Sequence, residues 1–182
     1  MDNDLKLVIL NHGHAEDVFK LIQQNRDFLR EWLPWVDGVD EPEDTSAFIT
    51  GTIDQHEKGR GPHFLIEFQG TPAGVIGFHP IDRPNRNAEI GYWLGEEFTG
   101  MGLMTRSVRQ LLKIGFRELN LNRIEIRCAE ENESSSAVAE AVGMVYEGTL
   151  REEEWLYDYF VDHAVYSMLH SEFLRTPAGI ED

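Results

Sequence analysis

The sequence predicts a mixed α/β (α+β) domain, and three observations support this prediction. Segments 63–67, 73–78 and 88–94 are rich in β-branched and aromatic residues and are joined by short polar connections, which favours antiparallel pairing. A helical pattern separates the strand at 88–94 from another at 123–128, as in a crossover between parallel strands. The chain has 182 residues, of which 41% are hydrophobic, and this is enough to bury a core.

The part of the chain before residue 63 is expected to supply one strand and two helices. Residues 5–10 have the pattern of a short strand, and apolar residues at helical spacing follow from Val18 to Leu29. The sequence Trp-Leu-Pro-Trp at 32–35 interrupts this helix, because proline disfavours helical backbone in the residue before it. A second helix is predicted at 43–58, where two glycines and a proline end it.

The C-terminal half is expected to contain two more helices and a closing hairpin. Apolar residues at three- and four-residue steps predict a helix at 104–119, which leads into the strand at 123–128. A shorter helix is predicted at about 133–142, where Gly143 ends it. The segments 144–150 and 155–169 then have the pattern of two paired strands.

Size and charge limit the organisation and the partners. We expect a single domain at residues 1–175 and a C-terminal tail at 176–182, since a chain of this length fits one ordinary domain. The chain has 33 acidic and 16 basic residues, a formal net charge of −17, which repels a polyphosphate backbone and argues against a nucleic acid partner. The acidity either steers a cationic amine or basic peptide toward a cleft or only aids solubility.

The single cysteine and the histidines predict neither a disulfide nor a metal site. Cys128 is the only cysteine and lies on the apolar face of an alternating strand, where a buried inert thiol is expected. His63 and His79 lack ligand spacing with cysteine or with each other, so no metal is predicted. The N-terminus has no apolar signal region and no segment approaches the ~20 apolar residues of a membrane span, which predicts a cytoplasmic protein without a membrane partner.

The loop between the strand at 88–94 and the following helix is suited to bind phosphate. Its sequence, Glu97-Phe98-Thr99-Gly100-Met101-Gly102, places two glycines just before a helix. Glycines let the backbone approach a ligand, and the N–H groups and dipole of a helix N-terminus favour an anion. Thr105 adds a hydroxyl donor in the first turn. The spacing matches neither a nucleotide P-loop nor the dinucleotide fingerprint, and a tight turn alone would also explain the glycines.

Several ordered motifs resemble one family, the GNAT-superfamily acetyltransferases of the RimJ/RimL type, which acetylate the N-termini of ribosomal proteins. The resemblance runs from the first strand to residues 166–169 and covers nearly the whole chain. In this family the first loop position is usually Gln or Arg, whereas this chain has Glu97, a departure that bears on coenzyme affinity. The motifs are Asn87-Ala88-Glu89-Ile90-Gly91-Tyr92-Trp93-Leu94, Gly100-Met101-Gly102 with Thr105, Leu121-Asn122-Arg123-Ile124, and Asn132-Glu133-Ser134-Ser135.

The resemblance implies a fold, a co-substrate and a set of contacts. The GNAT fold is a mixed, mostly antiparallel central sheet of about seven strands, with helices on both faces and splayed central strands. The implied co-substrate is acetyl-CoA, with a bulge at Gly91 presenting backbone N–H groups to the acetyl carbonyl, although an ordinary strand glycine would also explain this residue. The implied coenzyme-binding residues are Tyr92, Trp93, Leu94, Thr99, Gly100, Met101, Gly102, Leu103, Met104, Thr105, Asn132 and Ser135.

The resemblance also implies catalytic roles. Many members of the superfamily protonate the departing thiolate with a tyrosine, but the matching position here is Ala139. Ser135 lies one helical turn earlier on the same face, and in the RimJ/RimL branch a serine at this point is the proposed acid. Glu154, in a predicted loop before the last strand, and Glu89, on the active strand, are the candidate general bases. A solvated charge run explains Glu154 equally well. Helix capping alone would explain Asn132.

The acceptor is expected to be a primary amine that attacks acetyl-CoA directly in a ternary complex. An α-amine, with a pKa of about 7.7 to 8.0, is far more often neutral at pH 7 than a lysine near 10.4, so weak base candidates fit a protein N-terminus best. Trp32 and Trp35 beside acidic residues suit an ammonium group, although core packing would also explain them. The alternatives are acetylation of a small amine (polyamine, amino sugar or amino acid) and a non-catalytic CoA-binding sensor. The sequence leaves a homodimer open.

Overall fold

The computed structural model describes residues 4–176 and residue 179, and the chain forms two compact units. Unit 1 comprises Met1–Phe78 and Gly91–Ser107, and unit 2 comprises His79–Ile90 and Val108–Asp182. Two elements pass from one unit into the other, so each unit is described by itself. The single domain at 1–175 stays a prediction, and most of the predicted tail (177–178 and 180–182) lies outside the described residues.

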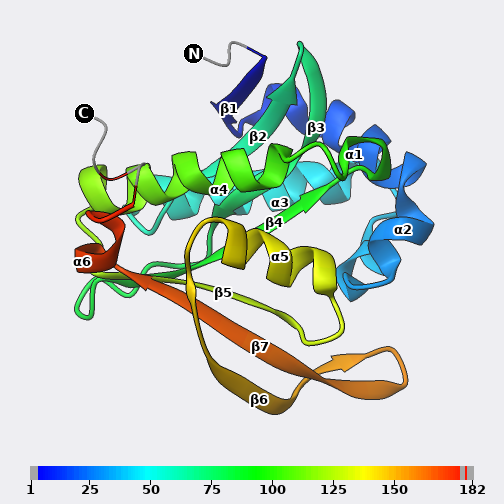
Figure 1. The fold of residues 1–182 in the computed structure, drawn as a ribbon. Helices are drawn as coiled ribbons and strands as arrows, with labels where there is room; N and C mark the ends of the chain where they lie inside the picture. The colour runs from blue at the N-terminus through cyan, green and yellow to red at the C-terminus, as the bar shows by residue number, and fades with distance from the viewer. Residues whose placement is uncertain (1–3, 177–178, 180–182) are drawn as a thin grey trace. The chain divides into compact units, whose positions relative to one another are not determined.

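Figure 1 shows the order of the elements along the chain. The strands are β1 (Leu5–Ile9), β2 (His63–Phe68), β3 (Thr71–Phe78), β4 (Asn87–Leu94), β5 (Arg123–Ala129), β6 (Val145–Leu156) and β7 (Tyr159–Leu169). The α-helices are α1 (Ala15–Gln24), α2 (Arg26–Arg30), α3 (Pro42–Glu57), α4 (Leu103–Lys113), α5 (Glu133–Ala141) and α6 (His170–Phe173). The mixed sheet of seven strands predicted from the sequence is confirmed.

Unit 1 is built on antiparallel strands covered by helices. β1 pairs with β2, and β2 pairs with β3, as the short connections between the strands predicted. The apolar residues of α1 face a core that also receives residues of α3 and of the strands. This core contains Leu10, Val18, Ile22, Leu29, Val36, Ile49, Leu65 and Val75.

The helix predicted from Val18 to Leu29 is divided into α1 and α2 at Asn25. Asn25 has φ −117° and ψ 16°, outside the helical region, and its side-chain amide donates to the carbonyl of Leu21 at 2.9 Å. An asparagine side chain that competes for a backbone carbonyl favours the end of a helix. The second interruption, at 32–35, is present as expected and forms a 3₁₀ turn from Pro34 to Gly38.

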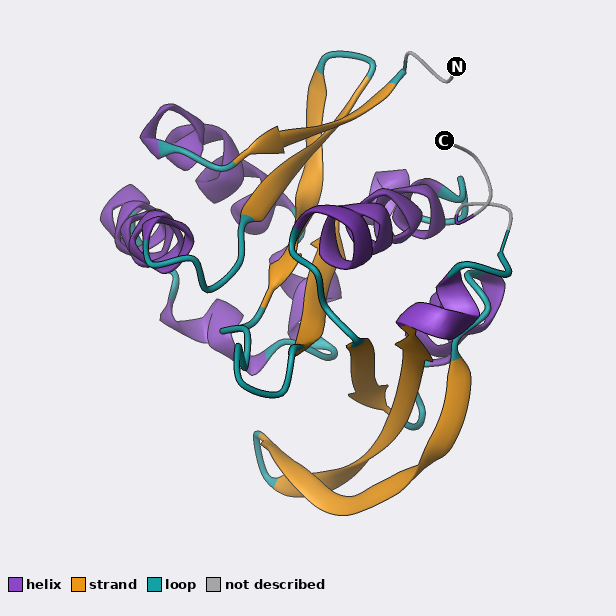
Figure 2. Ribbon diagram, turned by 90° about the vertical axis from the view of Figure 1, so that its left-hand side faces the viewer, coloured by secondary structure: helices purple, strands orange, loops and turns teal. Residues whose placement is uncertain are grey.

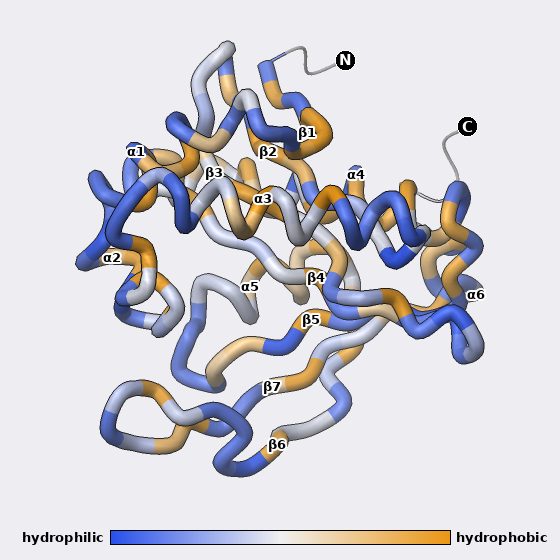
Figure 3. Tube along the Cα trace, turned by 180° about the vertical axis from the view of Figure 1, so that it is seen from behind, coloured by the Kyte–Doolittle hydropathy of each residue, from blue (hydrophilic) through white to orange (hydrophobic). Residues whose placement is uncertain are grey.

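The predicted crossover begins and ends in unit 2. The first residues of β4 pair in parallel with β5 over Asn87–Glu89, and α4 lies between these strands in the chain. β7 pairs antiparallel with both β5 and β6, and β6 and β7 form a long curved hairpin (Figure 2). Hydrophobic and hydrophilic residues alternate along β5 (Figure 3), where every second side chain is buried up to Cys128. The buried cysteine expected from the sequence is confirmed.

Two boundaries in unit 2 differ from the prediction. The hairpin was expected to break between residues 150 and 155, but β6 continues to Leu156 and the turn lies at Tyr157 and Asp158. A β-bulge between Leu150 and Glu154 absorbs the charged residues, and Glu152 takes a positive φ of 51° there. Neither Tyr157, at the turn, nor Glu152, at the bulge, is a residue type that signals a turn. The prediction that Glu154 lies in a loop was wrong, because this residue lies in β6, opposite Val161.

The ends of two further elements also escaped the sequence patterns. The helix predicted at 104–119 is α-helical only to Lys113 and continues as a π-helical segment, Ile114–Glu118. The short helix α6, which was not predicted, packs Phe173 against Phe116 at a ring distance of 5.0 Å. Among the described residues, no helix is long and apolar enough to cross a membrane.

Gly74 allows β3 to approach the second half of β4. A Cβ atom at Gly74 would overlap the carbonyl oxygen of Trp93 and come within 2.9 Å of Leu94 Cα. These are backbone atoms that cannot move aside without displacing β4, and the next residue along, Gly95, donates its N–H to Ala73 at 2.9 Å. The position of the strand that leads into the glycine loop therefore depends on the absence of a side chain at Gly74.

We predict that Gly74→Ala lowers the free energy of unfolding by about 3 kcal/mol, at the upper end of the usual cost of overpacking. Gly51→Ala is the matched control, because Gly51 lies within α3 and a Cβ there meets no atom within 4 Å. It should stabilise the protein by about 0.5–1 kcal/mol, since alanine favours helix. Urea unfolding followed by circular dichroism measures both, and equal effects of the two substitutions would contradict the close approach.

Candidate active site

The loop between β4 and α4 turns at two glycines that need a left-handed backbone. Gly100 has φ 71° and Gly102 has φ 70°, a region that other residues rarely adopt. A Cβ atom at either position would meet no atom of the protein within 4 Å. The glycines are therefore required by backbone geometry and leave open space beside the start of α4, where a ligand can approach.

The first turn of α4 presents backbone donors at this open space. Within the helix, the N–H of Arg106 bonds the carbonyl of Gly102 at 3.1 Å, so the preceding N–H groups of Leu103, Met104 and Thr105 have no acceptor inside the helix. The side chains of Leu103 and Met104 are buried. Of these two predicted coenzyme-binding residues, only the backbone can meet a ligand. Thr105 is half-buried.

Asn25 anchors the beginning of the loop, and the sequence reasoning missed this role. Its Oδ1 accepts the N–H of Glu96 at 2.8 Å, while its Nδ2 donates to Leu21, so the buried side chain joins the end of α1 to the loop. An asparagine among apolar residues at helical spacing was the signal that could have revealed it. A carboxylate oxygen of Glu97 lies at the same end of the loop, 2.9 Å from where a Cβ of Gly95 would stand.

The two predicted acceptor-site tryptophans differ in exposure. Trp35 is 43% exposed and its ring lies 6.2 Å from that of Trp93 on β4, tilted by 53°. Trp32 is half-buried. The neighbouring Val36 is fully buried in the unit 1 core and fixes the segment, so core packing does not explain Trp35. The structure thus brings Trp35, a predicted substrate residue, beside Trp93, a predicted coenzyme residue.

Two arginines of α2 fix the segment that carries Trp35. Arg30 donates two hydrogen bonds to Asp37, at 2.7 and 2.9 Å, and this guanidinium lowers the pKa of the Asp37 carboxyl. Arg26 donates to the carbonyls of Val36 and Val39. The segment that carries Trp35 is therefore folded back onto α2, and the charge of Asp37 is already paired.

In unit 2, Asn132 caps α5. Its Oδ1 accepts the backbone N–H of Ser135 at 3.1 Å and the hydroxyl of Ser134 at 2.8 Å, so the capping prediction is confirmed. Ser135 lies in the first turn and is half-buried, and Ala139, one turn later, is fully buried. The acid role of Ser135 and the coenzyme contact of Asn132 stay predictions.

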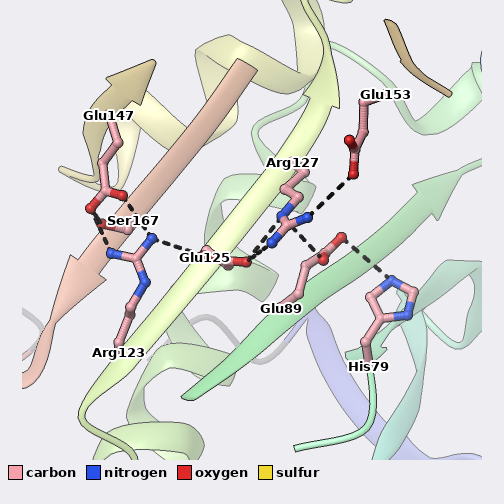
Figure 4. A network of polar contacts seen from close by, with 8 residues as sticks. All are labelled: His79, Glu89, Arg123, Glu125, Arg127, Glu147, Glu153 and Ser167. Carbon is pink, nitrogen blue, oxygen red and sulfur yellow. Dashed lines mark hydrogen bonds and ion pairs between the residues drawn. The ribbon is translucent and has the colours of Figure 1, made fainter. Parts of the chain in front are cut away.

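Glu89 lies in unit 2 at the end of a chain of alternating charges (Figure 4). Its carboxylate oxygens lie 3.5 Å from Arg127 Nε and 3.9 Å from His79 Nε2. Burial raises the pKa of Glu89, and the positive charges of His79 and Arg127 partly counteract this effect. A carboxyl with a raised pKa on the predicted active strand is a candidate for a functional site, and the base role of Glu89 stays a prediction.

Glu154, the other base candidate, is paired with a histidine. Its Oε2 lies 3.0 Å from Nε2 of His163 on β7, whose side chain is 15% exposed. The sequence reasoning did not select His163, because its partner is fixed by the register of β6 and β7 and by the bulge. Among residues 4–176 and 179, no group of three or more potential ligands could hold a metal ion.

The pattern of the acetyltransferase (GNAT) domain family matches residues 4–145. The chain belongs to this family. The fold and the enzyme class that the resemblance implied are thereby confirmed: the chain has the GNAT fold and is an acyltransferase.

Curated relatives of this GNAT chain include enzymes with two kinds of acceptor. The ribosomal-protein-serine acetyltransferase of Escherichia coli (strain K12) is 31% identical over 169 residues, which are 93% of this chain and 94% of that protein. The spermidine N(1)-acetyltransferase of the same organism is 26% identical over 133 residues, 72% of this chain and 68% of that protein.

Two solved structures are similar to this chain over most of its length. RimL, a ribosomal L7/L12 α-N-protein acetyltransferase in complex with coenzyme A, has a TM-score of 0.89 and 31% identity, and the match covers 92% of this chain and 95% of that one. The microcin C7 self-immunity acetyltransferase MccE, in complex with acetyl-CoA and AMP, has a TM-score of 0.88 and 28% identity, covering 92% and 93%.

Glu147, at the opposite end of the row of alternating charges that contains Glu89, gives a pH-dependent prediction. Arg123 and the Ser167 hydroxyl both bond Glu147 and lower its pKa to about 2. A carboxyl whose pKa is lower in the folded protein stabilises the fold above its unfolded pKa of about 4.3, and this stabilisation disappears as the pH falls toward 2.

We predict that Glu147→Gln lowers the free energy of unfolding at pH 7 by no more than about 1 kcal/mol, because solvent screens a side chain that is 42% exposed. The difference from the wild type should shrink as the pH falls from about 4.5 to about 2. Denaturant unfolding at several pH values measures it. A difference that stays constant over this interval would show that the ion pair does not contribute.

Proposed function

We propose that this GNAT protein transfers an acetyl group from acetyl-CoA to a primary amine, the N-terminal α-amine of a protein such as a ribosomal protein. The observation that carries the proposal is the open turn at Gly100 and Gly102, followed by backbone donors at the start of α4. RimL and MccE, the similar structures, bind coenzyme A and acetyl-CoA. We place the reaction in the cytoplasm, and a homodimer stays a prediction.

The coenzyme would bind through backbone groups along β4 and its loop. The N–H groups from Met101 to Thr105 receive the pyrophosphate, which suits the partial positive charge of a helix N-terminus. The exposed side chain of Met101 and the hydroxyl of Thr105 line the approach, and Thr99 fixes the turn by donating to the Glu96 carbonyl at 2.7 Å. The backbone of Tyr92, Trp93 and Leu94 pairs with the pantetheine arm. The coenzyme contacts of Asn132 and Ser135, which belong to unit 2, are proposed from the resemblance alone.

The proposed reaction is a direct attack that balances its protons. The neutral amine attacks the acetyl carbonyl carbon, a C–N bond forms and the C–S bond breaks. Backbone N–H groups of β4 around Gly91 stabilise the charge on the carbonyl oxygen. Glu89 accepts the proton lost by the amine, and the Ser135 hydroxyl donates a proton to the departing thiolate and regains one from solvent.

Glu89 is the first candidate for the base and Glu154 the second. Burial raises the pKa of Glu89 toward the pH at which a base works best, whereas Glu154 is already engaged with His163 at 3.0 Å. Glu89 also belongs to the strand whose backbone is proposed to bind the acetyl group. Glu154 stays a candidate because its position resembles that of the glutamate proposed as the general base of the ribosomal enzymes.

Acetylation of a small amine is the second candidate function, and the spermidine-acetylating relative favours it. The exposed Trp35 could pack against either acceptor, because an aromatic face attracts a polyammonium as well as a peptide N-terminus. The third candidate is a non-catalytic CoA-binding sensor, for which Glu97 and the absence of tyrosine at Ala139 are the reasons.

Coenzyme binding is tested by introducing charge at the two glycines. We predict that Gly100→Asp with Gly102→Asp weakens acetyl-CoA binding by about 100-fold or more, because two carboxylates repel the phosphates. The matched control, Gly100→Asn with Gly102→Asn, has nearly the same shape and tolerance of positive φ without charge, and should retain more of the affinity. Isothermal titration calorimetry measures all three proteins. If the wild type does not bind acetyl-CoA, the proposed function is wrong.

The acceptor and the catalytic roles are tested by initial rates with a thiol-reactive dye. We predict a kcat/KM at least about tenfold higher for peptides with a free N-terminus than for spermidine, and little activity on a peptide with a blocked N-terminus and an internal lysine. Ser135→Ala should lower kcat by about 10- to 100-fold, and Glu89→Gln by about 100-fold or more, compared with a smaller loss for Glu154→Gln.

The same assay separates the alternatives. A preference for spermidine would support the small-amine function. Binding of acetyl-CoA without turnover on any amine, unaltered by Ser135→Ala, would support the sensor. A larger loss of kcat for Glu154→Gln than for Glu89→Gln would make Glu154 the first candidate for the base and Glu89 the second.

A further inference from the structure

Glu89 and Glu125 lie opposite each other in the parallel ladder of β4 and β5. Like charges at directly opposed positions repel, and burial increases the cost. Arg127 lies two residues beyond Glu125, on the same face of β5. Its Nε is 3.5 Å from Glu89 Oε2 and 3.0 Å from Glu125 Oε1, so one guanidinium lies between the two carboxylates (Figure 4).

Arg127 is itself held firmly. It donates a second hydrogen bond to Glu125, at 2.7 Å, and Glu153 on β6 lies 3.6 Å from its third nitrogen. Glu125 is only 16% exposed and accepts a hydrogen bond from Arg123 at 2.8 Å. Arg123 is in turn bonded by Glu147. The guanidinium that faces Glu89 is therefore fixed from strands β5 and β6.

We infer that Arg127 is a positioning residue for the Glu89 carboxylate, which it holds on the active strand and whose ionised form it stabilises. The inference rests on the proposed function in so far as Glu89 is the base. A lysine would retain the charge but not the planar fork that bonds Glu125 while it faces Glu89.

The groups that face Glu89 explain why Arg127 controls its ionisation. They are His79, Arg127, Glu125 and His163. Glu125 and burial raise the pKa of Glu89, and the three cationic side chains lower it. An arginine guanidinium is effectively always protonated in proteins, so the positive charge of Arg127 persists over the whole working range. Removal of Arg127 must therefore raise the pKa of Glu89 and move the acidic limb of the activity profile to higher pH.

The test compares Arg127→Gln, Arg127→Lys and Arg151→Gln over the pH range. Arg151→Gln is the matched control, since it removes one positive charge from exposed β6 of the same unit. We expect Arg127→Gln to lower kcat/KM at pH 7 by about tenfold and to raise the midpoint of the acidic limb by about one pH unit. Arg127→Lys should keep the midpoint near the wild-type value with a reduced kcat, and Arg151→Gln should match the wild type.

A second readout separates this inference from the proposed function. Carbon-13 NMR titration of glutamate side chains, assigned with Glu89→Gln, follows the Glu89 carboxyl without any acceptor. An unchanged Glu89 titration in Arg127→Gln, or equal midpoints for the Gln and Lys variants, overturns the role of Arg127. If the Glu89 midpoint moves but Glu89→Gln keeps full activity, Arg127 still positions the carboxylate and the base assignment alone is wrong. Melting temperatures identify a variant that fails to fold.

Discussion

The left-handed backbone at Gly100 and Gly102 is the constraint on which the candidate coenzyme site depends. It allows the chain to leave β4 and begin α4 with no side chain at the two glycines that precede the helix. Asn25 fixes the start of this turn from the end of α1, and Gly74 permits the approach of β3 behind it. Two residues remote in sequence, Asn25 and Gly74, thus help to position a loop whose chemistry resides in its backbone. Glu97 can therefore replace the family's usual Gln or Arg without removing the donors.

The few basic residues of this acidic chain organise its candidate catalytic surfaces. Arg30 pairs with Asp37 beside Trp35, and Arg123 and Arg127 alternate with carboxylates across β4, β5 and β6. An arginine fork can bond two carboxylates at once, so a short row of arginines lets several glutamates share one face. Without such pairing, burial of Glu89 beside Glu125 would favour the protonated acid, which cannot act as a base.

The sequence predicted which helices and strands form better than it predicted where each one ends. The period of apolar residues found the strands and the long helices, and the glycine loop was found from its place between a strand and a helix. The turn at Tyr157 and the bulge at Glu152 were missed because neither residue type signals positive φ. Asn25 and Arg127 were missed for another reason: their partners, Glu96 and Glu89, are 71 and 38 residues away in the chain and depend on strand register.

The environment of Glu89 also bears on the acceptor. Burial raises the pKa of Glu89, while the charges of His79, Arg127 and His163 lower it. The proposed base is therefore a carboxylate whose basicity is only partly increased. An α-amine with a pKa of about 7.7 to 8.0 supplies roughly a tenth of its molecules in the neutral form at pH 7, whereas a lysine near 10.4 supplies about one in 2,500. A modest base suffices for the first acceptor and leaves the second largely unreactive. With Glu89 as the base of the proposed reaction, protein N-termini are therefore the expected acceptors, ahead of lysine side chains.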